Sequence, residues 1–209
     1  MAGEILFIAI AMVCAYIIGS FPSAYIVGRL RKGVDIREIG SRNMGAMNVF
    51  YQVGFVEGLL VLAADIGKGA AAVALARWLG VPVIAQLFAG VVVILGHDFS
   101  VFLKFHGGKG GASLIGILAF LIPWGIPFYL AVFGLGLLLT RYPTLSYGVA
   151  FICFPLVAWL KYHSPELVWY SAGMLLLLLL RYIPRLKEMY TRGGSWRRVF
   201  HRKDLKDRL

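Results

Sequence analysis

The sequence has little charge for its length. Only 15% of its 209 residues are Asp, Glu, Lys or Arg, whereas 60% are hydrophobic. A soluble domain of this composition would expose large apolar patches to water, and a disordered chain carries far fewer hydrophobic residues. Both classes are therefore excluded, and an all-α polytopic membrane protein is predicted.

Cysteine and acidic residues are also scarce. Cys14 and Cys153 lie in separate apolar runs, so neither a disulfide framework nor a metal site is expected. With 10 Asp and Glu against 21 Lys and Arg, the formal charge is +11. The bases lie between apolar runs rather than on one soluble face. We therefore attribute them to loops that follow the positive-inside rule, not to nucleic-acid binding.

No Lys or Arg precedes the first apolar run, so this run lacks the basic region of a signal peptide and is expected to be a retained span. The apolar runs cover residues 5–28, 55–78, 83–103, 112–140, 145–160 and 167–180. A crossing takes about 20 residues, so 112–140 is too long for one helix. It contains Pro123 and Gly125, and division there gives seven helices.

The distribution of basic residues predicts the orientation. Residues 1–4 carry none, whereas the loop after the first run carries five and the segment 185–209 carries nine. The positive-inside rule then places the N-terminus outside and the C-terminus in the cytoplasm, which requires an odd number of crossings. The unusual polar residues gather in loops 29–51, 104–111 and 140–147, all on the cytoplasmic side. A shared cytoplasmic site is expected there.

The segment 96–111 has the pattern of an anion-binding loop. Gly107, Gly108 and Gly110, with Gly111 behind them, flank Lys109 and allow backbone N–H groups to approach a phosphate, while a helix is expected to begin near Gly111. The Walker spacing is absent, so nucleotide binding is not implied. A flexible hairpin between helices is the alternative.

His97 and Lys104 precede this loop. Their spacing of seven predicts one helical face, with His97 as a base near neutral pH or as a structural histidine. Asp65 and Lys68 interrupt the second apolar run, three residues apart. They either form a structural ion pair or line a polar cavity.

The first cytoplasmic loop contains Ser41, Asn43 and Asn48 among small residues. These side chains suit a polar ligand, or else turns and caps.

Together these segments resemble the PlsY family, bacterial membrane glycerol-3-phosphate acyltransferases that use acyl phosphate. The resemblance runs from Gly19-Ser20 to Arg141-Tyr142. It rests on Ser41-x-Asn43-x-Gly45-Ala46-x-Asn48, Asp65-x-x-Lys68-Gly69, Gly96-His97, Val101-Phe102, Lys104-Phe105 and Gly107-Gly108-Lys109-Gly110. It implies a seven-helix bundle in the bacterial cell membrane with a cytoplasmic site.

The resemblance also implies acyl transfer to the 1-hydroxyl of glycerol 3-phosphate, giving lysophosphatidate and phosphate, with no metal or coenzyme A. None of the four histidines has Asp five residues later, which excludes the acyltransferase class with a His-x-x-x-x-Asp dyad. The catalytic candidates are His97, Ser41, Asn43 and Asn48. The substrate- and phosphate-binding candidates are Lys104, Gly107, Gly108, Lys109, Gly110, Asp65, Lys68, Arg141 and Thr144.

Several positions depart from the family pattern. Arg42 stands where the family has Gly, Met47 where it has Thr, and Ser100 where it has Pro; the segments 143–147 and 181–185 also differ. A divergent homologue that binds phosphate headgroups or serves as a subunit of a membrane assembly is therefore the alternative, and a small transporter is a second one. We expect one transmembrane domain, 1–184, and a basic cytoplasmic tail, 185–209, either solvated or lying on anionic lipid.

Overall fold

The computed structural model describes residues 2–200, and every regular element within them is helical. The chain forms two compact units, Met1–Phe120 and Leu121–Leu209. The helices that begin in the first unit are α1 (Ala2–Ser20), α2 (Ser23–Lys32), α3 (Ala46–Gln52), α4 (Phe55–Trp78), α5 (Val83–Asp98), the 3-10 turn η1 (Val101–Leu103) and α6 (Gly111–Leu121).

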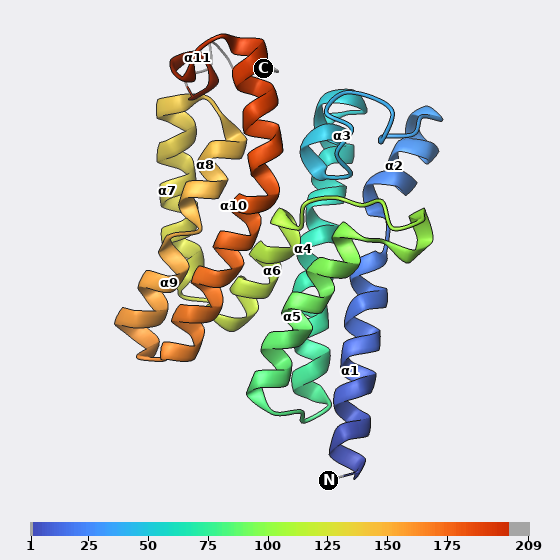
Figure 1. Cartoon of the computed structure of the whole chain (residues 1–209), viewed down its shortest axis with the longest axis vertical. Helices are drawn as coiled ribbons and strands as arrows, with labels where there is room; N and C mark the ends of the chain where they lie inside the picture. Colours follow the sequence, from blue (N-terminus) through green and yellow to red (C-terminus); the bar gives the residue numbers. More distant parts are fainter. Residues whose placement is uncertain (1, 201–209) are drawn as a thin grey trace. The chain divides into compact units, whose positions relative to one another are not determined.

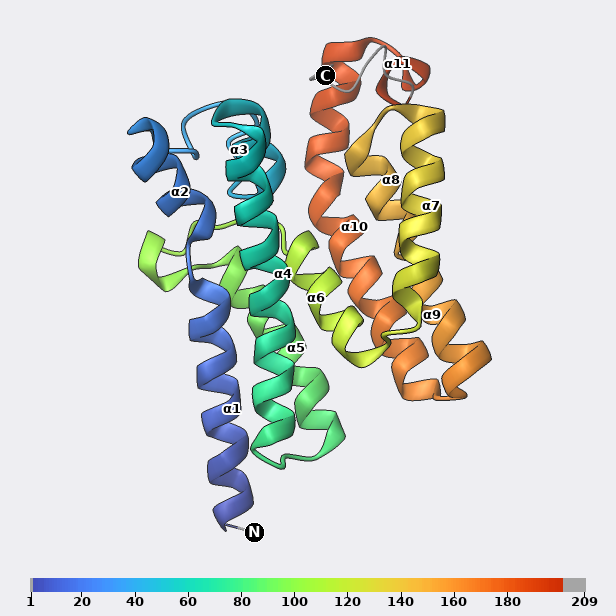
Figure 2. The ribbon, with the colours of Figure 1, turned by 180° about the vertical axis from the view of Figure 1, so that it is seen from behind.

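In the first unit α1, α4 and α5 pack side by side, with α2 and α3 against α4 (Figures 1 and 2). Glycines bring α1 and α5 into backbone contact. A Cβ added at Gly19 would lie 2.1 Å from the carbonyl oxygen of Val93, and one at Gly96 would lie 2.3 Å from that of Tyr16. In lipid the hydrophobic effect does not drive helices together, and small residues stabilise helix pairs by allowing close packing. Gly19 and Gly96 therefore set how closely α1 and α5 approach.

The first apolar run, 5–28, is not one continuous helix. Helix α1 ends at Ser20 and α2 begins at Ser23, with Phe21 and Pro22 between them. Proline has no N–H to donate and its ring clashes with the preceding turn, which explains the break. The break frees backbone carbonyls inside an apolar region, and these carbonyls must find other donors.

The long run 112–140 is also broken, where the sequence predicts it. Helix α6 ends at Leu121, and α7 (Gly125–Thr140) begins after Pro123 and Trp124. Within residues 2–200, five stretches are long and apolar enough to cross a membrane, namely Ala2–Lys32, Phe55–Trp78, Val83–Leu103, Pro143–Tyr162 and Pro165–Gly193. Helices α6 and α7 are shorter apolar helices. Side chains such as Trp78, Leu138 and Trp169 are about four-fifths exposed, as expected for a surface that contacts lipid.

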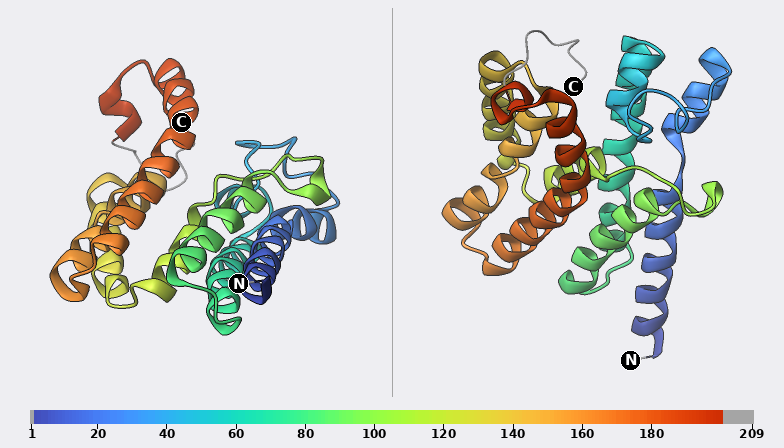
Figure 3. Two further views of the ribbon diagram at one scale, coloured as in Figure 1. Left: turned by 60° about the horizontal axis from the view of Figure 1, so that its bottom comes forward. Right: turned by 45° about the horizontal axis from the view of Figure 1, so that its top comes forward.

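The second unit contains α7, α8 (Pro143–Ala150), α9 (Cys153–Val157), the π-helical turn η2 (Ala158–Tyr162), α10 (Pro165–Gly193) and α11 (Trp196–Phe200). Helix α7 packs against α8 and α9, and α10 packs against α9 and α11. Helix α10 continues through Pro184, which Figure 3 shows as an unbroken orange-to-red ribbon. The basic segment predicted from residue 185 therefore begins inside α10, and its residues 201–209 lie outside the described part.

Candidate active site

The break between α1 and α2 organises the polar centre of the first unit. The Ser100 hydroxyl donates to the carbonyl oxygen of Ser20 at 2.6 Å, and Lys68 Nζ donates to that of Phe21 at 3.2 Å. Both carbonyls are ones that the proline break removes from regular helix bonding. Because an unsatisfied carbonyl is costly away from water, these two side chains stabilise the break.

Asp65 contacts several polar side chains of this centre. Its Oδ1 accepts a hydrogen bond from the Ser23 hydroxyl at 2.6 Å and lies 2.9 Å from Lys68 Nζ. Asp65 is 1% exposed and Lys68 8%. The two are three residues apart on α4, the spacing that the sequence predicts to pair. Lys68 thus joins the carboxylate to the broken helix end at Phe21.

His97 lies on the last turn of α5 and is buried. Its Nδ1 is 3.9 Å from Asp65 Oδ1, which is within ion-pair range but too long for a hydrogen bond. On the other side of the ring, a Cβ added at Gly108 would lie 2.1 Å from His97 Nε2. The imidazole therefore has a carboxylate near one nitrogen and the glycine loop near the other. A histidine that acts as a base needs a partner near one nitrogen and access to substrate at the other, and Asp65 is placed as such a partner.

The glycine loop folds back on the end of α5. The Gly108 N–H donates to the carbonyl oxygen of His97 at 3.1 Å, so this N–H is used inside the loop rather than directed at an anion. A Cβ at Gly107 would lie 2.0 Å from the same oxygen, and one at Gly108 would lie 2.6 Å from the carbonyl oxygen of Met44. The first loop and the glycine loop therefore meet, and α6 begins at Gly111 as the sequence predicts.

The expectation that His97 and Lys104 share one helical face is wrong. Helix α5 ends at Asp98, the backbone of Phe99 and Ser100 leaves helical geometry, and Lys104 stands in the left-handed region at φ 53°. A continuous helix was needed to bring positions seven apart into line. Lys104 is exposed, whereas Lys109, which follows Gly108 in the sequence, is partly buried.

Asn48 holds the first loop together. Its amide nitrogen donates to the carbonyl oxygens of Ile36 at 2.9 Å and Ile39 at 3.1 Å, and its oxygen accepts from the Ser41 N–H at 3.1 Å. The side chain is 3% exposed. Ser41 is exposed and Asn43 is partly exposed on the same loop. Asn48 thus acts inside the loop, and Ser41 and Asn43 lie nearer to solvent.

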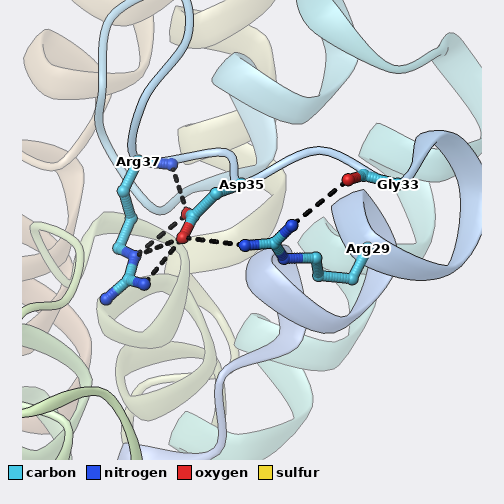
Figure 4. Close-up of polar contacts among 4 residues, drawn as sticks. All are labelled: Arg29, Gly33, Asp35 and Arg37. Carbon is cyan, nitrogen blue, oxygen red and sulfur yellow. Dashed lines mark hydrogen bonds and ion pairs between the residues drawn. The ribbon is translucent and has the colours of Figure 1, made fainter.

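An ion pair fixes the other end of this loop (Figure 4). Arg37 donates to Asp35 through its backbone N–H and its guanidinium, and its Nη2 lies 2.7 Å from Asp35 Oδ2. The Nη2 atom of Arg29 lies 3.5 Å from the same oxygen. The hydrogen bond from Arg37 holds the pKa of Asp35 below its ordinary value. Both guanidinium groups also lie over the Tyr25 ring.

Arg141 and Thr144 belong to the second unit. Arg141 ends α7 at φ 54°, with its N–H donating to the carbonyl oxygen of Leu137, and Thr144 lies in the first turn of α8. Nearby, the Tyr142 hydroxyl bonds to that of Tyr182 and to Met189 Sδ at 3.2 Å. Tyr182, at one of the positions that depart from the family pattern, is thus built into the packing of this unit.

Ser23 is the residue that sequence reasoning missed. The pattern that could have pointed to it is a proline near two serines, Ser20-Phe21-Pro22-Ser23, towards the end of an apolar run. Such a break needs polar partners, but the sequence does not say which ones. In the described part of the chain, no three His, Cys, Asp or Glu side chains come together as a metal site.

Known proteins similar to this chain identify its family. A family model described as glycerol-3-phosphate acyltransferase matches residues 9–192. The chain is 51% identical over 208 residues to glycerol-3-phosphate acyltransferase 2 of Dehalococcoides mccartyi, with 99% of each chain covered. It is 50% identical over 139 residues to the glycerol-3-phosphate acyltransferase of Bacillus velezensis, covering 66% of this chain and 72% of the relative.

Solved structures of PlsY, an integral membrane glycerol 3-phosphate acyltransferase, are also similar. The lysophosphatidic acid form has a TM-score of 0.81 at 27% identity, with 96% of this chain and 97% of that chain covered. The glycerol 3-phosphate form has a TM-score of 0.80 at 28% identity, covering 88% and 92%. The resemblance found in the sequence is confirmed. The chain is a multi-pass membrane protein and belongs to the glycerol-3-phosphate acyltransferase family.

Proposed function

We propose that this protein transfers an acyl group from acyl phosphate to the 1-hydroxyl of glycerol 3-phosphate, giving lysophosphatidate and inorganic phosphate. Similarity along nearly the whole chain to relatives named for this acyltransferase supports the proposal. The single structural observation that carries it is His97, buried between the Asp65 carboxylate and the glycine loop.

The chemistry needs one proton to move. The acceptor hydroxyl attacks the carbonyl carbon of acyl phosphate, the new ester C–O bond forms, and the bond from that carbon to the phosphate oxygen breaks. His97 Nε2 takes the hydroxyl proton and returns it to the phosphate that leaves. Asp65, near Nδ1, stabilises the imidazolium while it holds the proton.

Most of the remaining candidates are proposed to bind substrate. We assign phosphate binding to the loop Gly107–Gly110, through donors other than the Gly108 N–H that His97 already occupies, and to Lys104. Ser41 and Asn43 supply polar contacts to the acceptor. Asn48 and Lys68 act mainly through the backbone that they support, as their hydrogen bonds indicate. Arg141 and Thr144 are further phosphate-binding candidates from the second unit.

For the membrane placement, we propose that the two shorter apolar helices cross the membrane together with the five long spans, giving seven crossings. With the distribution of basic residues, this puts the N-terminus outside, and the C-terminus and the site in the cytoplasm of a bacterial cell, in its inner membrane. Acyl phosphate and the product are lipid-tailed, so they reach the site from the bilayer.

Purified full-length protein in nanodiscs, supplied with acyl phosphate and glycerol 3-phosphate, tests the proposal. We expect phosphate and lysophosphatidate in equal amounts, no lysophosphatidate from acyl coenzyme A, and a large loss of turnover in His97→Gln. Binding of glycerol 3-phosphate without any product would instead favour the alternative of a headgroup-binding subunit. The relatives from Dehalococcoides mccartyi and Bacillus velezensis are both named glycerol-3-phosphate acyltransferase, which does not favour that alternative.

A further inference from the structure

We propose that Ser23 is a positioning residue for acyl transfer, holding the Asp65 carboxylate so that it orients His97. The role rests on the proposed function above. Ser23 is 5% exposed, and its hydroxyl donates to Asp65 Oδ1 at 2.6 Å, although 42 residues separate the two in sequence.

The position of Ser23 is set by its neighbours. It is the first residue of α2, directly after Pro22, where the chain leaves α1. Lys68 binds the carbonyl oxygen of Phe21 and Ser100 binds that of Ser20, so the chain before Ser23 is tied to α4 and to the segment after α5. These hydrogen bonds hold the backbone before Ser23 in place and so position the Ser23 hydroxyl next to Asp65.

The donors of Asp65 fix which way the carboxylate faces. Ser23 and Lys68 both hold Oδ1, whereas Oδ2 has no hydrogen-bond partner among the described residues. His97 Nδ1, 3.9 Å from Oδ1, likewise has no hydrogen bond there. The two donors on this oxygen come from different helices, Ser23 from α2 and Lys68 from α4 itself, so loss of the Ser23 hydroxyl removes the one that ties the carboxylate to another element. The His97–Asp65 contact is then ready to tighten when substrate fills the site.

A purely structural role for Ser23 makes different predictions. If the hydroxyl served only to satisfy a buried carboxylate, its loss would lower stability and the yield of folded protein, but each folded molecule would keep its turnover. If it positions His97 through Asp65, its loss lowers kcat of the folded enzyme. KM for glycerol 3-phosphate would stay unchanged, because the Ser23 hydroxyl bonds to Asp65 and not to the glycine loop to which we assign the phosphate.

The experiment compares Ser23→Ala, Ser23→Thr and Ser171→Ala in the full-length enzyme, with kcat, KM for glycerol 3-phosphate and thermal unfolding measured for each. Ser171 is a matched control, since it is also buried, but its hydroxyl donates to carbonyls of its own helix in the second unit. We expect Ser23→Ala to lose kcat roughly ten- to a hundredfold with KM unchanged. Ser23→Thr, which keeps the hydroxyl, should recover most of the rate, and Ser171→Ala should keep the wild-type kcat.

Wild-type kcat in folded Ser23→Ala, or an equal loss in Ser171→Ala, would overturn the positioning role while leaving the acyltransferase function intact. Absence of turnover in the wild-type protein would overturn both. If Ser23→Ala does not fold, Ser23→Cys takes its place, because a thiol of similar size is a much weaker donor.

Discussion

The Gly108 N–H donates to the carbonyl oxygen of His97, and the Cα of Gly108 lies so close to the His97 ring that a Cβ there would stand 2.1 Å from Nε2. Backbone and imidazole are thus in contact at the nitrogen to which we assign the proton transfer. The loop and the proposed base form one unit, and the absence of a side chain at position 108 is what permits it.

Gly108→Ala is therefore expected to displace the His97 ring or the loop and to lower kcat about a hundredfold. Steady-state phosphate release measures the effect. Gly173→Ala in α10 is the control, because a Cβ there meets nothing within 4 Å. Equal activity of the two variants would show that the glycine loop does not need its close approach to His97.

Arg42→Gly is expected to raise stability. Arg42 stands at φ 57°, in the left-handed region that costs a non-glycine residue about 1–3 kcal/mol. Part of this gain is offset by the greater freedom of glycine in the unfolded chain, so we expect about 0.5–1 kcal/mol. Thermal unfolding measures it. Arg42→Ala removes the same charge but keeps the strain, and a similar gain in that variant would attribute the effect to charge.

Acid is expected to weaken the Asp35–Arg37 pair. Since Arg37 lowers the pKa of Asp35, the pair stabilises the fold above the pKa that the carboxyl has when unfolded, about 3.9, and this is lost as the pH falls through the lower folded pKa. Asp35→Asn should therefore cost about 1.5–3 kcal/mol at pH 7 and less below about pH 4. The free energy of unfolding is measured across this pH range for Asp35→Asn and for the control Glu38→Gln, which removes an exposed carboxylate from the same loop. A cost that does not vary with pH would contradict the assignment.

Asn48→Asp is expected to be worse than Asn48→Ala. The amide nitrogen of Asn48 donates to two carbonyl oxygens, and a carboxylate there would face both without a proton to offer. Asn48→Ala should cost about 2–3 kcal/mol through lost hydrogen bonds, and Asn48→Asp should cost more. Unfolding measurements on both variants decide; the opposite order would show that the loop does not depend on these donors.

The proposed orientation is tested by labelling. With Cys14 and Cys153 replaced by Ala, a single cysteine at Gly3 should react with a membrane-impermeant reagent from outside whole cells. One at Ser195 should react only after the membrane is opened. Gly3 has open space around it, so the change is tolerated. Labelling of both from the same side would require an even number of crossings.

The sequence by itself determines those features that depend on composition or on near neighbours. The scarcity of charge predicts membrane helices, and Pro123 predicts the break between α6 and α7. The spacing of Asp65 and Lys68 offers an ion pair as one of two readings, and the structure shows that pair. Each of these rests on local geometry or on the cost of burial. The glycine loop before α6 is predicted for the same reason.

Only the tertiary structure decides which distant groups meet. The bond from Ser23 to Asp65 spans 42 residues, and the bond from Ser100 to Ser20 spans 80. Both depend on how closely α1, α4 and α5 approach, which packing sets. Lys104 fails to align with His97 because α5 ends at Asp98, and the segment after it is tied to the end of α1 by the hydrogen bond from Ser100 to Ser20. Periodicity gives the face of a helix only while the helix lasts, and the length of this one is a property of the folded molecule.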